Sequence, residues 1–321
     1  MPLNPQTEAF FASMAEGGDR PQTHEQQPAE ARQGYLALAQ ALGPGPELHQ
    51  VEDRKIPGEH DDIPLRVYTP KASDNALPAL IYFHGGGWVI GDLDTHDREC
   101  RLLADQADCV VIAVDYRLAP EHPFPASHQD CWSALHYVVE HPGHFNIDAG
   151  RIAVGGDSAG GNLSAFVALA ARDAQIDLKL QMLIYPATDA RAHHPDSEHE
   201  PYPSLLENAD AVVLTRDTMR YFASHVATGQ NHKDVVNDWR MSPLLAENHE
   251  GLAPAFIATC EFDPIRDEGN VYAEKLQAAG VPVQHKVWAG QPHLLFQLSP
   301  VLDDGKALIS ECVSALKDAF K

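Results

Sequence analysis

Short apolar runs alternate with helix-like segments through most of this chain, and this alternation constrains the fold more than any other feature. Strands of a parallel sheet are buried on both faces, so they need not alternate apolar and polar residues. Six such runs are predicted to be strands: 79–84, 109–116, 151–156, 178–186, 254–260 and 281–288. Helices are predicted over about 96–107, 127–140, 160–172, 265–279 and 303–319. This order predicts a three-layer α/β sandwich with a mostly parallel central sheet.

Two regions do not follow this alternation. Residues 1–45 carry apolar patches too short to fold alone, and about 65 residues separate the run 178–186 from the next run, far more than an ordinary connection. We expect residues 1–45 and an insertion over 187–225 to form a helical cap over the carboxyl edge of the sheet. The core is then expected to comprise 46–186 and 226–321, with an antiparallel hairpin over about 48–69 at a sheet edge.

The charge and the cysteines exclude several classes of function. A formal net charge of -23, from 46 acidic and 23 basic residues, opposes binding to nucleic acid or to an anionic membrane. Five widely spaced cysteines without a C-x-x-C pair do not suggest zinc or a redox centre, and we expect them to be buried free thiols. We also expect no cofactor. The chain lacks a basic start followed by a long apolar run, which predicts a cytoplasmic protein.

Residues 156–160, GDSAG, form a G-x-S-x-G motif directly between the run 151–156 and the predicted helix 160–172. A strand that reverses into a helix within so few residues forces Ser158 into strained backbone geometry, and the flanking glycines remove Cβ atoms that would clash. The hydroxyl is thereby held at the sheet edge, beside free helical N–H groups that favour negative charge. We therefore predict that Ser158 is a nucleophile rather than an ordinary turn serine.

A second motif, HGGG at residues 84–87, follows the apolar run 79–84. Three consecutive glycines leave backbone N–H groups unshielded, as a tetrahedral oxyanion requires. We predict oxyanion-hole donors at Gly86 and Gly87, with Gly85 as a further candidate and Ala159 as the donor after the nucleophile. His84 is expected to brace this loop. A flexible glycine-rich turn is the alternative, whereas a phosphate-binding loop is excluded because the required lysine and G-x-G-x-x-G spacing are absent.

A nucleophilic serine needs a general base, usually a histidine that an acidic residue orients. In α/β folds with a G-x-S-x-G nucleophile, these three residues occur along the chain in the order Ser, then Asp or Glu, then His, so we expect the base beyond the last strand. His293 follows the run 281–288 in the segment AGQPH, where its ring could reach Ser158. His285 lies inside that run and is interpreted as a strand residue.

The orienting acid is expected after the preceding strand, where four carboxylates occur between residues 261 and 268. Asp263 precedes a proline that disfavours helix, so its side chain can project towards the histidine. Asp267 and Glu268 are expected in the first turn of the next helix, where acids are favourable. Asp263 is therefore our prediction, with Glu261 as the alternative.

Together these segments resemble the bacterial hormone-sensitive-lipase-like esterases, the GDSAGG branch of the α/β-hydrolases. The resemblance implies an α/β-hydrolase core with a helical cap, ester hydrolysis without a metal, and frequent homodimers. It also assigns family roles to Ser158, Asp263, His293, the loop 84–87 and Ala159. The family often has glycine where this chain has Leu294, which puts the local loop geometry in doubt. The matching segments are HGGGWVIGDLDTHD (84–97), DYRLAPEHPFPA (115–126), GGDSAGGNLS (155–164), EFDPIRDEG (261–269) and PHLLF (292–296).

These observations predict a carboxylesterase that hydrolyses short- to medium-chain esters through a Ser158 acyl-enzyme. An amidase or lactonase would use the same triad, and a non-catalytic small-molecule receptor could share the fold. The segment 115–126 carries no obvious catalytic group, and its prolines suit a rigid loop that supports the HGGG turn.

Overall fold

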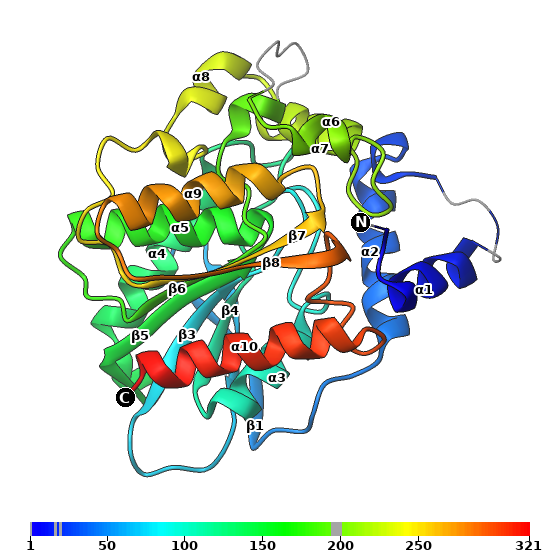
Figure 1. Ribbon diagram of the computed structural model, residues 1–321. Coiled ribbons are helices and arrows are strands. Elements are labelled where there is room, and N and C mark those ends of the chain that lie inside the picture. The colour runs from blue at the N-terminus through cyan, green and yellow to red at the C-terminus, as the bar shows by residue number, and fades with distance from the viewer. Residues whose placement is uncertain (1, 16–17, 19–20, 194–200) are drawn as a thin grey trace.

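The computed structural model describes residues 2–15, 18, 21–193 and 201–321, and it contains one eight-stranded sheet (Figure 1). The strand order is β1-β2-β4-β3-β5-β6-β7-β8. β1 pairs with β2 and β2 with β4 in antiparallel fashion, while all other neighbours are parallel. The predicted mostly parallel sheet with a hairpin at one edge is confirmed. The strands are β1 Gln50–Ile56, β2 Ile63–Thr69, β3 Leu77–Phe83, β4 Val110–Val114, β5 Ile147–Asp157, β6 Leu180–Ile184, β7 Ala255–Phe262 and β8 Val283–Pro292.

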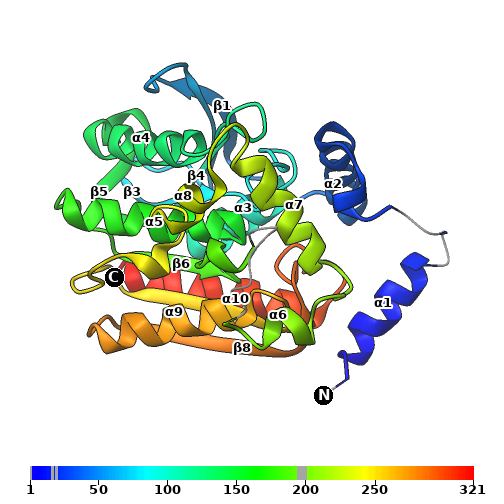
Figure 2. The same cartoon turned by 90° about the horizontal axis from the view of Figure 1, so that it is seen from above.

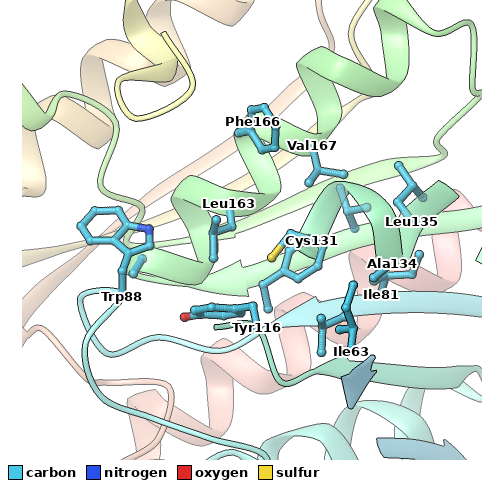
Figure 3. Packing of buried hydrophobic residues seen from close by; sticks show 14 of the residues in the cluster. Ile63, Ile81, Trp88, Tyr116, Cys131, Ala134, Leu135, Leu163, Phe166 and Val167 are labelled. Carbon is cyan, nitrogen blue, oxygen red and sulfur yellow. The ribbon is translucent and has the colours of Figure 1, made fainter. Parts of the chain in front are cut away.

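Helices cover both faces of the sheet, with α4, α5 and α9 on one face and α3 and α10 on the other (Figure 1). Figure 3 shows the first of these layers, where Cys131 and Leu135 of α4 and Leu163 and Val167 of α5 pack over Ile81 of β3. This arrangement is the predicted three-layer sandwich. The helices are α1 Pro5–Ala15, α2 Pro28–Leu42, α3 Asp97–Ala107, α4 Ala126–Glu140, α5 Ala159–Asp173, α6 Ser204–Glu207, α7 Arg216–Val226, α8 His232–Asn237, α9 Arg266–Ala278 and α10 Asp303–Ala319.

The predicted strand 281–288 ends too early, since β8 continues to Pro292. After a register shift, the end of β8 pairs with β7 through Phe262 and Pro292. The polar segment AGQP gave no apolar signal, because its backbone pairing follows from β7 and not from its own side chains. His293 is therefore placed at the end of a paired strand, immediately beside the parallel neighbour that leads to Asp263.

The described parts of the N-terminal segment, residues 2–15, 18 and 21–45, lie at the carboxyl edge of the sheet together with α6 and α7 from the β6–β7 connection (Figures 1 and 2). The segment is tied to β8, because Asn4 N–H donates to the Gly290 carbonyl (2.9 Å) and the Thr7 hydroxyl donates to Gln291 Oε1 (2.7 Å). His24 Nδ1 lies 3.1 Å from Thr218 Oγ1 of α7, which links the two segments directly. Residues 194–200 of the expected insertion lie outside the described residues, and the expected boundary at 225 falls inside α7.

All five cysteines are buried free thiols, as their spacing predicted. In the described ranges, no helix has both the length and the apolar character needed to cross a membrane.

Candidate active site

Ser158 occupies a sharp turn between the end of β5 and the start of α5, with φ 55° and ψ -116°. The end of β3 passes very close to this turn. A Cβ added to Gly156 would lie 2.2 Å from the Phe83 carbonyl oxygen, and one added to Gly160 would lie 1.9 Å from the same atom. Both positions therefore require glycine, and the strained geometry expected for this serine is present.

Three side chains that the sequence analysis singled out lie within hydrogen-bond distance of one another. His293 Nε2 is 3.0 Å from Ser158 Oγ, and His293 Nδ1 is 2.6 Å from Asp263 Oδ2. Asp263 is fully buried, and its other oxygen accepts a hydrogen bond from the Ile265 N–H (3.0 Å). Because an ionised carboxylate only accepts, it favours the tautomer with hydrogen on Nδ1, which leaves Nε2 able to accept the serine proton.

The competing candidates are engaged elsewhere. Glu261 accepts from the Gly290 N–H at 2.7 Å, and His285 lies in β8 with its Nε2 3.3 Å from Thr259 Oγ1. Asp267 and Glu268 fall in the first turn of α9, where they pair with Arg266 and His193. The choice of His293 over His285, and of Asp263 over the other carboxylates, therefore agrees with the geometry.

The glycine loop requires one correction. The N–H of Gly85 donates to Asp157 Oδ1 at 3.1 Å, so this amide points into the protein and does not serve as an oxyanion donor. Gly86 and Gly87 have positive φ angles of 117° and 59° and line the cavity beside Ser158. Ala159 is the first residue of α5, where helical N–H groups have no intrahelical acceptor. The three remaining predicted donors therefore stay candidates.

His84 is buried beneath this loop. Its ring stacks on the ring of Tyr116, with centroids 4.3 Å apart, and its Nδ1 lies 2.7 Å from the Gly85 carbonyl oxygen. The Tyr116 hydroxyl donates to the His84 carbonyl at 2.7 Å, and the Ala119 N–H donates to the Trp88 carbonyl at 2.9 Å. Burial lowers the pKa of His84 to about 3, so the ring is neutral and its Nδ1–H can donate to Gly85. These contacts support a bracing role for His84 and for the segment 115–126.

Leu294 follows His293 with φ 75°, a left-handed conformation that is costly for a branched side chain. This is the position at which the hormone-sensitive-lipase-like esterases, which the sequence resembles, often have glycine. The leucine therefore adopts the backbone geometry that glycine would favour, and the histidine stays in place at a cost of about 1–3 kcal/mol in backbone strain.

A cavity of about 370 Å³ opens beside Ser158 and His293. Its walls include Met14 and Leu38 from the N-terminal segment and Leu214 and Phe222 from the β6–β7 connection. A Cβ on Gly87 would lie 2.2 Å from the Phe222 ring, so the bare glycine loop lets α7 approach the site closely. Across the described part of the chain, no cluster of three or more histidine, cysteine or acidic residues could hold a metal ion.

Asp157, the residue before the nucleophile, has a role that was not predicted from the sequence. Asp157 is buried and contacts Tyr82, Gly85, His96 and Gln297. Burial raises the pKa of this carboxyl, but the His96 charge and the hydrogen bonds lower it by more, so that the pKa is about 2. The variable position of G-x-S-x-G gave no signal, because the partners of Asp157 come from separate segments of the chain.

The fold and the Ser158–His293–Asp263 arrangement define an α/β hydrolase. A family model described as the alpha/beta hydrolase fold matches residues 80–297, and the chain belongs to this family, as its motifs predicted. It is 42% identical over 294 residues to the carboxylic ester hydrolase LipN of Mycobacterium tuberculosis, covering 89% of this chain and 75% of that protein. It is 35% identical to the ethyl acetate hydrolase of Pseudomonas putida over 99% of both chains. A hyperthermophilic esterase from Pyrobaculum calidifontis superposes with a TM-score of 0.90 at 35% identity, with 99% of each chain covered.

Proposed function

We propose that the protein is a carboxylesterase that cleaves short- to medium-chain esters through a Ser158 acyl-enzyme. The unbroken hydrogen-bonded line Asp263–His293–Ser158, with distances of 2.6 and 3.0 Å, carries this proposal. The names of the similar proteins, carboxylic ester hydrolase and ethyl acetate hydrolase, support the same reaction. The N-terminal segment and the β6–β7 connection act as the cap that encloses the substrate.

Acylation begins when Ser158 Oγ attacks the ester carbonyl carbon while His293 Nε2 accepts the hydroxyl proton. Asp263 holds the ring orientation and stabilises the imidazolium without itself taking the proton. Negative charge that develops on the carbonyl oxygen is stabilised by the N–H groups of Gly86, Gly87 and Ala159. Collapse of the tetrahedral intermediate breaks the bond to the alkoxy group, which leaves as the alcohol with the proton from His293.

Deacylation repeats these steps with water. The oxygen of a water molecule attacks the acyl carbon while His293 accepts a proton from that water. The same amides stabilise the second oxyanion. The bond to Ser158 Oγ then breaks, His293 returns the proton to the serine, and the carboxylic acid leaves. The cycle requires only the ester and water.

The size of the cavity supports the preference for shorter acyl chains. A volume of about 370 Å³ lies at the lower end of the range for small-molecule pockets. Its apolar walls favour a hydrocarbon chain over a charged one, because burial of an unpaired charge is costly.

Replacement of Ser158 by alanine tests the proposed mechanism. We expect kcat for p-nitrophenyl butyrate to fall by about 10,000-fold or more, because only oxyanion stabilisation and binding would remain. The wild type should also be labelled by a fluorophosphonate and the variant should not. Ser310→Ala, an exposed serine on α10, is the matched control and should behave like the wild type.

Retained turnover in a folded Ser158→Ala variant would refute the nucleophile. A parallel assay of a matched p-nitroanilide distinguishes ester hydrolysis from amide hydrolysis, since an amidase would turn over the anilide at a comparable kcat/KM.

A further inference from the structure

A buried polar network lies beneath the candidate active site, and its centre is Gln297, in the turn after β8. Its Nε2 group donates to Asp157 Oδ2 and to the Tyr35 hydroxyl oxygen, each at 2.9 Å. Its Oε1 accepts from the Tyr185 hydroxyl at 2.7 Å. The ring of His96 completes the cluster, because its Nε2 lies 3.2 Å from Asp157 Oδ1. Through its hydrogen bonds, Gln297 thus joins Tyr35, Asp157 and Tyr185, which come from three other parts of the chain.

Asp157 connects this network to both halves of the oxyanion site. It precedes Ser158 in the chain, and its Oδ1 accepts from the Gly85 N–H (3.1 Å) and from the Tyr82 hydroxyl (2.6 Å). The fit is close, because a Cβ on Gly85 would lie 2.3 Å from Asp157 Oδ2. A shift of this carboxylate would therefore move the nucleophile turn and the glycine loop relative to each other.

Tyr35 brings the N-terminal segment into the network. It lies on α2, and its ring borders both the cavity beside Ser158 and a second cavity of about 320 Å³. The same helix binds two further segments, since Arg32 donates to the carbonyl of Val89 (2.8 Å), just after the glycine loop, and to the carbonyl of Ala119 (3.0 Å). Helix α2 is therefore held at two separate points, on the segment after the glycine loop through Arg32 and on the polar network through Tyr35.

The network also reaches the general base. The Tyr185 hydroxyl donates to Gln297, while the Tyr185 ring packs against the His293 ring with centroids 4.4 Å apart. Gln297 is 3% exposed, so its hydrogen bonds do not compete with bulk water.

We propose that Gln297 is a positioning residue that couples α2 to the glycine loop, the nucleophile turn and the base, with Tyr35 as its contact on α2. The oxyanion donors are then correctly placed only when α2 is seated on the core. This proposal rests on the proposed esterase function, because it concerns how that site is held in its reactive geometry.

Tyr35→Phe tests the coupling, because it removes the hydroxyl and keeps the ring that lines the cavity. We expect kcat for p-nitrophenyl butyrate to fall about 3- to 10-fold while KM stays within about twofold. The inhibition constant of an alkylboronic acid, which forms a tetrahedral adduct with Ser158, should rise by the same factor as kcat falls. Tyr221→Phe is the matched control, since its buried hydroxyl has no hydrogen-bond partner among the described residues. It should leave kcat, KM and boronate inhibition within about twofold of the wild type.

Gln297→Met gives a second measurement, because it keeps the length of the side chain and removes the amide. We expect a larger loss in kcat than for Tyr35→Phe, and the double variant should be no slower than Gln297→Met alone. If Gln297→Met does not fold, the Tyr35→Phe result decides.

An unchanged kcat in Tyr35→Phe would overturn the coupling, as would a loss that appears only in KM with unaltered boronate inhibition. A wild type without ester turnover would instead refute the proposed function, so the two failures are distinguishable.

Discussion

Gly160 shows how a single residue can set the geometry of the site. A Cβ at this position would lie 1.9 Å from the Phe83 carbonyl oxygen and 2.7 Å from that of His84. We expect Gly160→Ala to lower the free energy of unfolding by about 2 kcal/mol or more, because backbone and not a flexible side chain would have to move. Urea denaturation measures this loss, and ester turnover should fall as Ser158 is displaced.

Gly143→Ala is the matched control for this change. No atom lies within 4 Å of the added Cβ at Gly143, so stability should stay within about 0.5 kcal/mol of the wild type. A Gly160→Ala variant as stable and active as the wild type would contradict the close approach of β3 to the nucleophile turn.

Individual site residues were predictable to different degrees. Ser158, Asp263 and His293 could be selected from the sequence because each follows a strand whose carboxyl end meets the same edge of the sheet. The glycine run could not show which amides face the substrate, so Gly85 was misassigned. Gln297 could not be identified at all, because its partners lie more than a hundred residues away along the chain.

Among the secondary-structure elements, the core strands were predictable and the helices near the site were not. Core strands are apolar runs, whereas α6, α7 and α8 are short and polar, and which of their faces is buried depends on tertiary contacts. Helix α7 nevertheless places Phe222 against the glycine loop, where it forms part of the cavity wall. The wall of the cavity beside Ser158 is therefore formed in part by an element that the sequence did not resolve.

Phe222→Ala should shift this preference. With the ring removed, the cavity lengthens, and we expect the optimum in a C2 to C12 series of p-nitrophenyl esters to move by about two carbons or more, because added methylene groups gain buried area. The wild-type optimum should lie among the shorter chains. Met219→Ala, a buried position on the same helix outside the cavity wall, controls for general loosening of α7.

Two results would count against the proposed chain-length preference or against the role of Phe222 in the cavity wall. A wild-type optimum at C12 would overturn the preference for short to medium chains, and an equal shift in Met219→Ala would show that Phe222 is not a specific part of the wall.

For the molecule as a whole, acid stability depends on histidines that folding buries in neutral form. His128 is 1% exposed, and its Nε2 lies 3.3 Å from Asn162 Oδ1, so the contact joins α4 to α5. Burial lowers the pKa of His128 from 6.5 to about 4, and the nearby Arg240 charge lowers it as well. Between these two values the unfolded chain binds a proton at this residue and the folded protein does not. Stability from this source is therefore present above pH 6.5 and is lost as the pH falls towards 4.

His128→Gln isolates this contribution from all other titrations. The wild type and the variant carry the same carboxylates, so the change in a net charge of -23 during acidification affects both alike. The difference in unfolding free energy, wild type minus variant, should be constant above neutral pH and fall by about 2–3 kcal/mol as the pH drops to 4. Urea denaturation of both proteins across this range measures it. A free-energy difference that does not change with pH would contradict this prediction. It would mean that His128 takes up its proton in the folded protein as readily as in the unfolded chain, although its burial between two core helices should prevent this.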